Sequence, residues 1–146
     1  MGILVNATDK EKGLARHISV KSLVDLVLRG IELVTSNSIE SDIIIELAFK
    51  ILINLINSDP DIFENHRDGI VLQIFKIIQF FYKDFQIIAQ QYVIRFIYHL
   101  SKTWTPEKLE HNMQDLVPII ELFILYCVTL SDMKLILLTI DRMSSS

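Results

Sequence analysis

The sequence predicts an all-α fold, a right-handed α-solenoid of about seven helices, because two patterns recur with nearly the same period. Two apolar helical stretches share polar positions at a constant offset, since 91−46, 95−50 and 99−54 all give 45: Glu46, Lys50 and Asn54, then Gln91, Arg95 and His99. An apolar stripe also returns 47 residues on, with Val24, Val27, Leu28, Ile31 and Val34 matched by Val71, Ile74, Phe75, Ile78 and Phe81. A fixed period in this range, carried by helical segments, is typical of stacked helical repeats.

Length and composition predict one domain over residues 1–146. The chain has 146 residues, of which 51% are hydrophobic and 22% charged, and a domain of this size buries roughly 68% of the surface of its unfolded chain. The mean hydropathy of +0.39 indicates helices covered on several sides or a surface meant for a neighbour. The expected divisions are a flexible or partly helical start at 1–18, a first unit at 19–57, a second at 59–102 and a third, partial unit at 105–143.

Charge, cysteine content and the N-terminus indicate the compartment and argue against some partners. The net charge is −4, with Lys and Arg scattered rather than clustered, so the sequence does not favour nucleic acid as a partner. The single Cys127 cannot form an internal disulfide, which suits a reducing compartment, and its apolar surroundings predict a core position. The N-terminal residues lack the apolar stretch of a signal peptide, and polar residues interrupt every apolar run before the ~20 residues that a membrane span needs. We therefore expect an intracellular protein, cytoplasmic or nuclear, without a membrane span.

Each expected helix follows from apolar spacings of three and four residues and from a start signal. The helices are expected at residues 20–35, from Ser38 or Ser41 to about 57, 60–66, 70–82, 84–102, from 105 with an interruption and then over 116–130, and up to about 143. The expected N-caps are Ser19, Ser38 or Ser41 with Asp42, Asp59, Asp84, Thr105, and Ser131 with Asp132. Pro60 and Pro106 stand at first helical positions, where a missing N–H costs nothing. Gly69 ends the short third helix, whereas Asp115 and Pro118 are expected to interrupt the helix that begins after residue 105.

The second unit resembles the armadillo repeat, in which a short first helix precedes a glycine, a second helix follows, and a third ends in an alanine-leucine-serine-asparagine-leucine-like signature. The stretch DPDIFENHRDGIVLQIF, residues 59–75, looks like the acidic first helix, the glycine corner and the apolar second helix. DLVPII, residues 115–120, resembles the same corner with Asp115 in place of glycine, and in ILINL, residues 51–55, Asn54 matches the family's asparagine. The resemblance covers residues 19–143. HEAT repeats and the eight-helix solenoid domains of vesicle adaptors share the same apolar spacing.

The resemblance implies a partner-binding surface, because the third helices of armadillo proteins line a concave face whose asparagine holds the main chain of a bound peptide. The positions carried over form two sets, Asn54 with Lys50 and Glu46, and His99 with Arg95 and Gln91. Spacing by four independently places each set on one face of its helix. The hypothesis is that Lys50 and Arg95 attract an acidic or carbonyl-rich segment, whose backbone the asparagine and the histidine hydrogen-bond. The alternative is an ordinary wet stripe, in which Glu46 and Lys50 form an exposed ion pair worth ~0.3 to 0.5 kcal/mol.

The sequence predicts no catalytic, metal or cofactor site. The four histidines do not stand in a zinc-binding spacing: His17, His66, His99 and His111. Nucleophile elbows, phosphate loops and dinucleotide fingerprints need glycines at spacings that the four Gly of this chain do not supply. His66 with Asp68, and His111 with Asp115, are interpreted as solvated helix ends rather than oriented general bases. We therefore expect neither an enzyme nor a bound cofactor.

Two classes of function remain open. The first is a non-catalytic protein–protein interaction scaffold that binds a partner protein or peptide. The second is a membrane-traffic adaptor-type helical superhelix that binds lipid heads or sorting signals, whose best basic cluster is Lys10, Lys12, Arg16 and His17. The stretch MKLILLTI, residues 133–140, is apolar close to the end of the sequence, which predicts a continuing chain or a homo- or hetero-oligomer through apolar terminal helices. Core positions are expected for the aromatic residues Trp104, Phe75, Phe80, Phe81, Tyr82 and Phe85.

Overall fold

The computed structural model of the chain describes residues 22, 25–33, 42–60 and 71–144. These residues lie in helices or in the turns between them, and no strand occurs among them, which confirms the predicted all-α class. Seven helical elements have defined bounds: α3 (Asp42–Ser58), α5 (Leu72–Phe81), the 3-10 helix η2 (Tyr82–Asp84), α6 (Ile87–Thr103), α7 (Pro106–His111), α8 (Met113–Tyr126) and α9 (Leu130–Ser144). Residues 25–33 are also helical.

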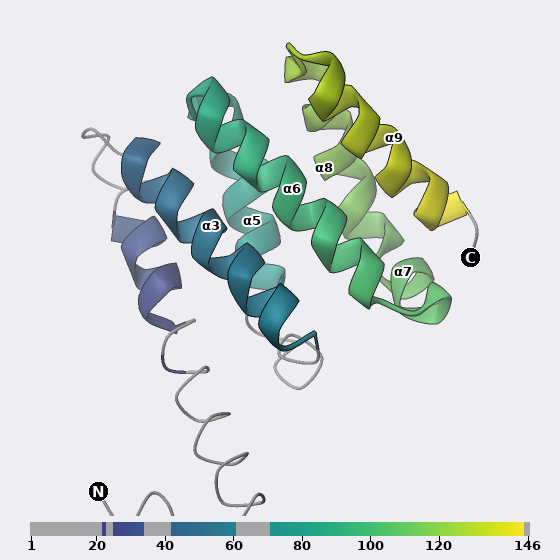
Figure 1. The fold of residues 1–146 in the computed structure, drawn as a ribbon, viewed down its shortest axis with the longest axis horizontal. Helices are drawn as coiled ribbons and strands as arrows, with labels where there is room; N and C mark the ends of the chain where they lie inside the picture. Colours follow the sequence, from purple (N-terminus) through teal and green to yellow (C-terminus); the bar gives the residue numbers. More distant parts are fainter. Residues whose placement is uncertain (1–21, 23–24, 34–41, 61–70, 145–146) are drawn as a thin grey trace, which may run out of the picture.

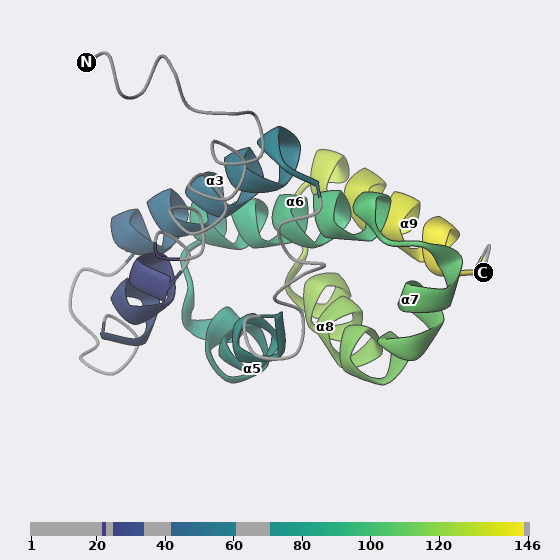
Figure 2. The same cartoon turned by 90° about the horizontal axis from the view of Figure 1, so that it is seen from below.

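The helices form two layers (Figure 1, Figure 2). In one layer α3, α6 and α9 lie side by side, and the colour gradient shows that all three run in the same direction. The central helix α6 packs against α3 on one side and against α9 on the other. In the second layer α5 packs against α8, and the helix at residues 25–33 lies below α3 in Figure 2. A hydrogen bond of 2.5 Å from Gln73 Nε2 on α5 to Glu32 Oε1 joins that helix to α5.

A continuous apolar core fills the space between the layers and between neighbouring helices. Phe49 and Phe96 meet edge to face, with ring centroids 5.5 Å apart, and so join α3 to α6. Trp104 is buried, and the centroid of its ring lies 6.2 Å from that of Phe75, which confirms the core position predicted for this tryptophan. Aromatic pairs of this kind add about 0.5 to 1.5 kcal/mol beyond the burial of their surface.

The aromatic series predicted for the core divides between core and surface. Phe75, Tyr82 and Phe85 are buried and Phe81 is half-buried, but the side chain of Phe80 is 70% exposed. The prediction is wrong for Phe80 because the buried face of α5 carries Ile77 and Ile78, which turns Phe80 toward solvent. Cys127 is also half-buried rather than in the core. It follows the last residue of α8, and its Sγ donates a hydrogen bond to the carbonyl oxygen of Thr129 at 3.3 Å.

Threonine side chains cap two of the helices. Thr105 Oγ1 accepts a hydrogen bond from the Lys108 N–H at 3.3 Å, and Pro106 occupies the first turn of α7, as the sequence predicts. The last helix begins at Leu130, slightly earlier than predicted, because Thr129 Oγ1 accepts from the Asp132 N–H at 3.2 Å. An N-cap of this type contributes typically about 1 kcal/mol.

Three further predicted helix boundaries are wrong. The helix predicted at 116–130 ends at Tyr126, with Cys127 as its extended C-cap. Asp84 does not cap α6, since it lies in η2, and α6 begins at Ile87 after an extended residue 86. The side chain of Gln90 holds this corner, because its Nε2 donates to the Tyr82 carbonyl oxygen at 2.9 Å.

Pro118 does not interrupt a helix, because it lies inside α8, and the break instead falls at Asn112 between α7 and α8. Proline deprives the carbonyl of residue i−4 of its helical N–H partner. Gln114 and Pro118 are both exposed, so the free carbonyl lies on the solvent side of the helix, where water can bind it.

Several predictions fall outside the described ranges: those for Ser19, Ser38, Ser41, Gly69, residues 1–18, most of the helix at 60–66, and the basic cluster of Lys10, Lys12, Arg16 and His17. Among the helices that the structure describes, none is both long enough and apolar enough to cross a bilayer.

Candidate binding surface on helices α3, α6 and α9

The two polar rows predicted as a partner-binding site lie on neighbouring helices. Glu46, Lys50 and Asn54 belong to α3, and their counterparts Gln91, Arg95 and His99 belong to α6. Lys50, Asn54 and Arg95 are exposed, whereas the other three side chains are half-buried. Because α3 and α6 pack together and run in the same direction, equivalent positions on them face the same side of the layer. The structure therefore brings the predicted residues to one surface.

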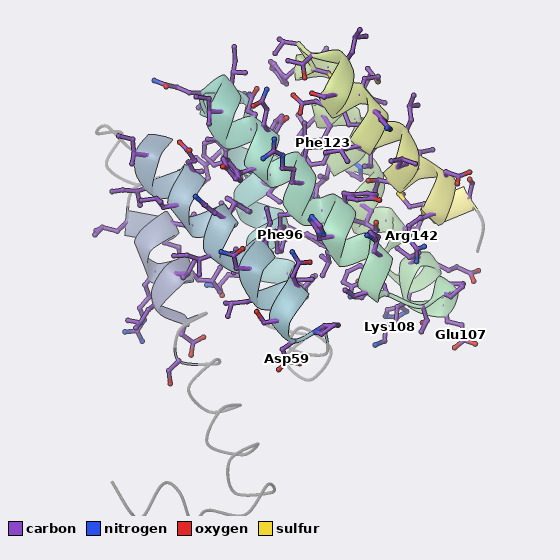
Figure 3. All side chains as sticks on the ribbon, viewed as in Figure 1. Asp59, Phe96, Glu107, Lys108, Phe123 and Arg142 are labelled. Carbon is purple, nitrogen blue, oxygen red and sulfur yellow. The ribbon has the colours of Figure 1, made fainter. Side chains whose placement is uncertain are left out.

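Helix α6 presents three rows of side chains. Its upstream row, toward α3, is buried and consists of Ala89, Val93, Phe96 and Leu100. Its second buried row, which we call the downstream row, consists of Gln90, Ile94, Ile97 and Ser101. Its outer row is the predicted set of Gln91, Arg95 and His99, on the opposite side of the helix. In Figure 3, Phe96 marks the junction with α3 and Arg142 marks the junction with α9.

Helix α9 repeats these rows 43 residues later. Its upstream row is buried like that of α6, since 132−89, 136−93, 139−96 and 143−100 all give 43: Asp132, Ile136, Thr139 and Met143. By the same offset, its outer row is Lys134, Leu138 and Arg142. The sequence reasoning missed this third outer row, because the period shortens from 45 to 43 and a leucine replaces the cation of the middle position. The signal for this row was the cap of the helix. Thr129 accepts a hydrogen bond from the N–H of the buried Asp132, which sets where α9 begins and therefore which of its residues form each row.

Arg142 links the last helix of the layer to the helix before it. Its Nε donates a hydrogen bond to the Ser101 carbonyl oxygen at 3.2 Å, and its Nη2 donates to the Lys102 carbonyl oxygen at 3.4 Å. Both acceptors belong to the last turn of α6, where carbonyl groups have no helical partner and a positive charge is favourable. Arg142 occupies the position on α9 that His99 occupies on α6 and Asn54 on α3. On α9 this residue links the helix to α6, whereas Asn54 on α3 is exposed.

Aromatic rings hold two cations of the surface on α6. Arg95 Cζ lies 5.1 Å from the centre of the Tyr92 ring, and Lys102 Nζ lies 5.3 Å from the centre of the Tyr98 ring. A cation over an aromatic face gains about 0.5 to 1 kcal/mol at an exposed site. The rings therefore restrict both side chains before any partner binds, which lowers the entropy lost on binding.

His99 stands between these two cations. Its ring centroid lies 5.6 Å from that of Tyr98. Burial lowers the pKa of His99 below its usual value, and the charges of Lys102 and Arg95 lower it further. The imidazole is consequently neutral at pH 7, with one nitrogen that donates and one that accepts a hydrogen bond.

We call the three outer rows together with Lys102 the outer surface. Its exposed cations are Lys50, Arg95, Lys102 and Lys134, and the three rows contain one carboxylate, that of Glu46. The chain as a whole carries −4, and the outer surface is thus opposite in sign to the rest of the molecule, which favours negatively charged groups near it.

No metal site accompanies this surface in the described residues, where no three His, Cys, Asp or Glu side chains come together. No protein-family model, curated protein or solved structure matches the chain.

Proposed function

We propose that the protein is a non-catalytic protein-interaction module, an α-solenoid of armadillo-like units whose outer surface binds an acidic segment of a partner protein. The observation that carries the proposal is the alignment of equivalent polar rows on three parallel, adjacent helices. Repeated units that present the same positions side by side form an extended surface, and such surfaces bind other macromolecules. An extended segment can cross several units of this kind at once.

Charge supports an acidic partner. Four exposed cations lie on the outer surface, and Arg95 and Lys102 are already restricted by tyrosine rings. Each exposed ion pair is worth at most about 1 kcal/mol, so affinity requires several contacts along the segment. The main effect of the positive charge on the outer surface is to raise the rate of association with an acidic segment and to select against basic segments.

Polar groups between the cations support binding to the main chain of the segment. Asn54 is exposed, and its side-chain amide carries both donors and an acceptor. The neutral imidazole of His99 offers the same pair of functions from α6. These groups hydrogen-bond a peptide backbone of any sequence, so the cations select the segment and the amide and imidazole hold it in register.

The test is affinity capture from a cell extract with three immobilised forms of the protein: the wild type, Arg95→Glu and the control Lys76→Glu. Lys76 is exposed on α5 in the second layer, so the control makes the same change of charge on a helix away from the outer surface. We expect the wild type and Lys76→Glu to retain the same partner, and Arg95→Glu to lose it. Equal capture by all three forms, with equal circular dichroism and melting curves, would refute the proposal.

The adaptor-type alternative makes a different prediction. Its best basic cluster, around Lys12, lies outside the described residues. Within them, the cations that lipid head groups could contact include those of the outer surface. Flotation with vesicles of phosphatidylcholine and phosphatidylserine separates the two. Our proposal predicts no flotation, whereas flotation that Arg95→Glu abolishes would favour lipid binding.

A further inference from the structure

The layer of α3, α6 and α9 ends in a partly exposed apolar row on α9. The downstream row of α6 is buried, and its counterparts on α9 are Met133, Leu137, Ile140 and Ser144. Ile94 in this row of α6 is 2% exposed, whereas its counterpart Leu137 is 56% exposed. Leu130 and Leu138 beside it are exposed too, and with Met133, Lys134 and Leu137 they line a shallow apolar groove. A row that is buried in α6 is therefore partly exposed in α9, where Leu137 is exposed but Met133 and Ile140 are half-buried.

The opposite end of the layer shows the complementary feature. The upstream row of α6 is buried against α3, and its counterparts on α3, 45 residues earlier, are Ile44, Ala48, Ile51 and Leu55. Phe96 is fully buried, whereas its counterpart Ile51 is 36% exposed. Ile43 and Leu47 on the same helix are exposed as well. Within the described residues, Ile44 and Ile51 of the upstream row of α3 are thus exposed, whereas Ala48 is buried and Leu55 is half-buried.

The same kind of junction occurs twice inside the molecule. The downstream row of α3 meets the upstream row of α6, as the Phe49–Phe96 contact shows. Helix α6 packs in the same way against α9 on its other side, and Arg142 of the outer row of α9 reaches the last turn of α6. The two partly exposed rows, downstream on α9 and upstream on α3, correspond in position to the two sides of these junctions.

We propose that a second copy of this chain supplies the missing neighbour, so that α9 of one copy packs against α3 of the next in a head-to-tail assembly. Burial of two apolar rows drives the contact. Lys134 on α9 and Glu46 on α3 are equivalent positions by the offsets of 43 and 45 residues. If the new contact aligns the helices as the internal contacts do, Lys134 lies at the same helical turn as Glu46 of the second copy, and opposite charges meet at the edge of the contact. A pair of copies joined in this way keeps one free row of each kind, so a contact between different surfaces repeats rather than closing at two copies.

Two substitutions block the two halves of the junction separately. Leu137→Glu places a charge in the downstream row of α9, and Ile51→Glu places one in the upstream row of α3. Leu130→Lys and Ile43→Lys are second variants at more exposed positions, where the side chains are 90% and 69% exposed, so that folding is preserved. Phe80→Glu is the control, because Phe80 is exposed on α5 in the other layer.

Light scattering after size exclusion measures the outcome. We expect the mass of the wild type and of Phe80→Glu to rise with concentration through dimer and beyond, and each blocked variant to stay monomeric. An equal mixture of Leu137→Glu and Ile51→Glu should give a dimer of twice the monomer mass, because each variant keeps the half that the other has lost. The proposal is overturned if the wild type is monomeric at every concentration. It is equally overturned if Ile51→Glu alone still dimerises, since that result indicates a symmetric contact through α9. Arg95→Glu leaves this assembly intact, which separates it from the partner-binding surface.

Discussion

The hydroxyl of Tyr82 offers the sharpest test of the packing, because its removal should make the protein more stable. Tyr82 is buried, and its ring lies 5.1 Å from that of Phe123 and 6.3 Å from that of Tyr126, between centroids. Its Oη has no hydrogen-bond partner in the described structure. Burial raises the pKa of Tyr82 far above its usual value, and the nearby Asp132 and Cys127 raise it further. The hydroxyl is therefore a neutral polar group taken out of water without compensation.

The size of the effect follows from that missing bond. A buried polar group without a partner costs about 1 to 3 kcal/mol. The substitution Tyr82→Phe keeps the ring and its aromatic contacts, but it also leaves a gap of one oxygen atom, which removes part of the gain. We therefore expect the free energy of unfolding to rise by about 1 to 2 kcal/mol. For 146 residues the entropy of unfolding is roughly 0.3 kcal/mol per degree, so Tm should rise by about 3 to 6 °C.

Urea unfolding followed by circular dichroism measures the change directly, with a thermal melt as a second reading. Tyr126→Phe is the matched control, because Tyr126 belongs to the same aromatic cluster but is half-buried. We expect the control to change stability by less than about 0.5 kcal/mol. A loss of 1 kcal/mol or more in Tyr82→Phe, relative to the control, would show that the hydroxyl is hydrogen-bonded and would refute the reasoning.

Three further perturbations test the junctions and the surface. Phe96→Ala should lower the free energy of unfolding by about 3 to 5 kcal/mol, and a double-mutant cycle with Phe49→Ala should give a coupling of about 0.5 to 1.5 kcal/mol; urea unfolding gives both, and a zero coupling contradicts the edge-to-face contact. Arg142→Met keeps the aliphatic stem but loses two hydrogen bonds to α6, so it should cost about 1 kcal/mol in the same assay, and an unchanged midpoint would contradict the link. Because the pKa of His99 is lowered in the folded state, the unfolded chain takes up its proton first, and stability should fall as pH drops through about 6.5 and below. His99→Gln should flatten that part of the stability profile, and an identical profile in the two forms would count against the pKa shift.

The all-α class was predictable because local signals agreed with one another. Apolar spacing and polar breaks predicted a second helix that begins after Ser38 or Ser41 and ends near Asn57, and α3 spans Asp42–Ser58. Thr105 and Pro106 predicted the start of α7 because capping depends on neighbouring residues alone. The interior position of Pro118 could not be read from the sequence, because tolerance of the proline depends on which side of α8 faces solvent, and that is a property of the tertiary structure.

The rows of the candidate surface could be predicted where the offset between equivalent residues was constant, and could not be predicted where the offset changed. The constant offset of 45 was enough to identify the rows of Lys50 and Arg95. The third row escaped because Leu138 stands where those cations stand, and because a different connection shifts the offset by two residues. Its role was hidden for another reason, since the contact from Arg142 to the end of α6 spans 41 residues and exists only when α6 and α9 lie side by side.

The central place of α6, with a packed neighbour on each side, also sets the order in which the protein opens. A helix flanked by two others in its layer loses contacts at both junctions when it unfolds, whereas α9 loses them at one within the described part of the chain. Amide hydrogens in the middle of α6, around Val93 and Ile97, should therefore exchange with solvent most slowly, at the rate set by global unfolding. Amides of α9 should exchange through a local opening that costs less free energy than global unfolding. We therefore expect α9, at the edge of the described layer, to unfold locally while α6 remains folded.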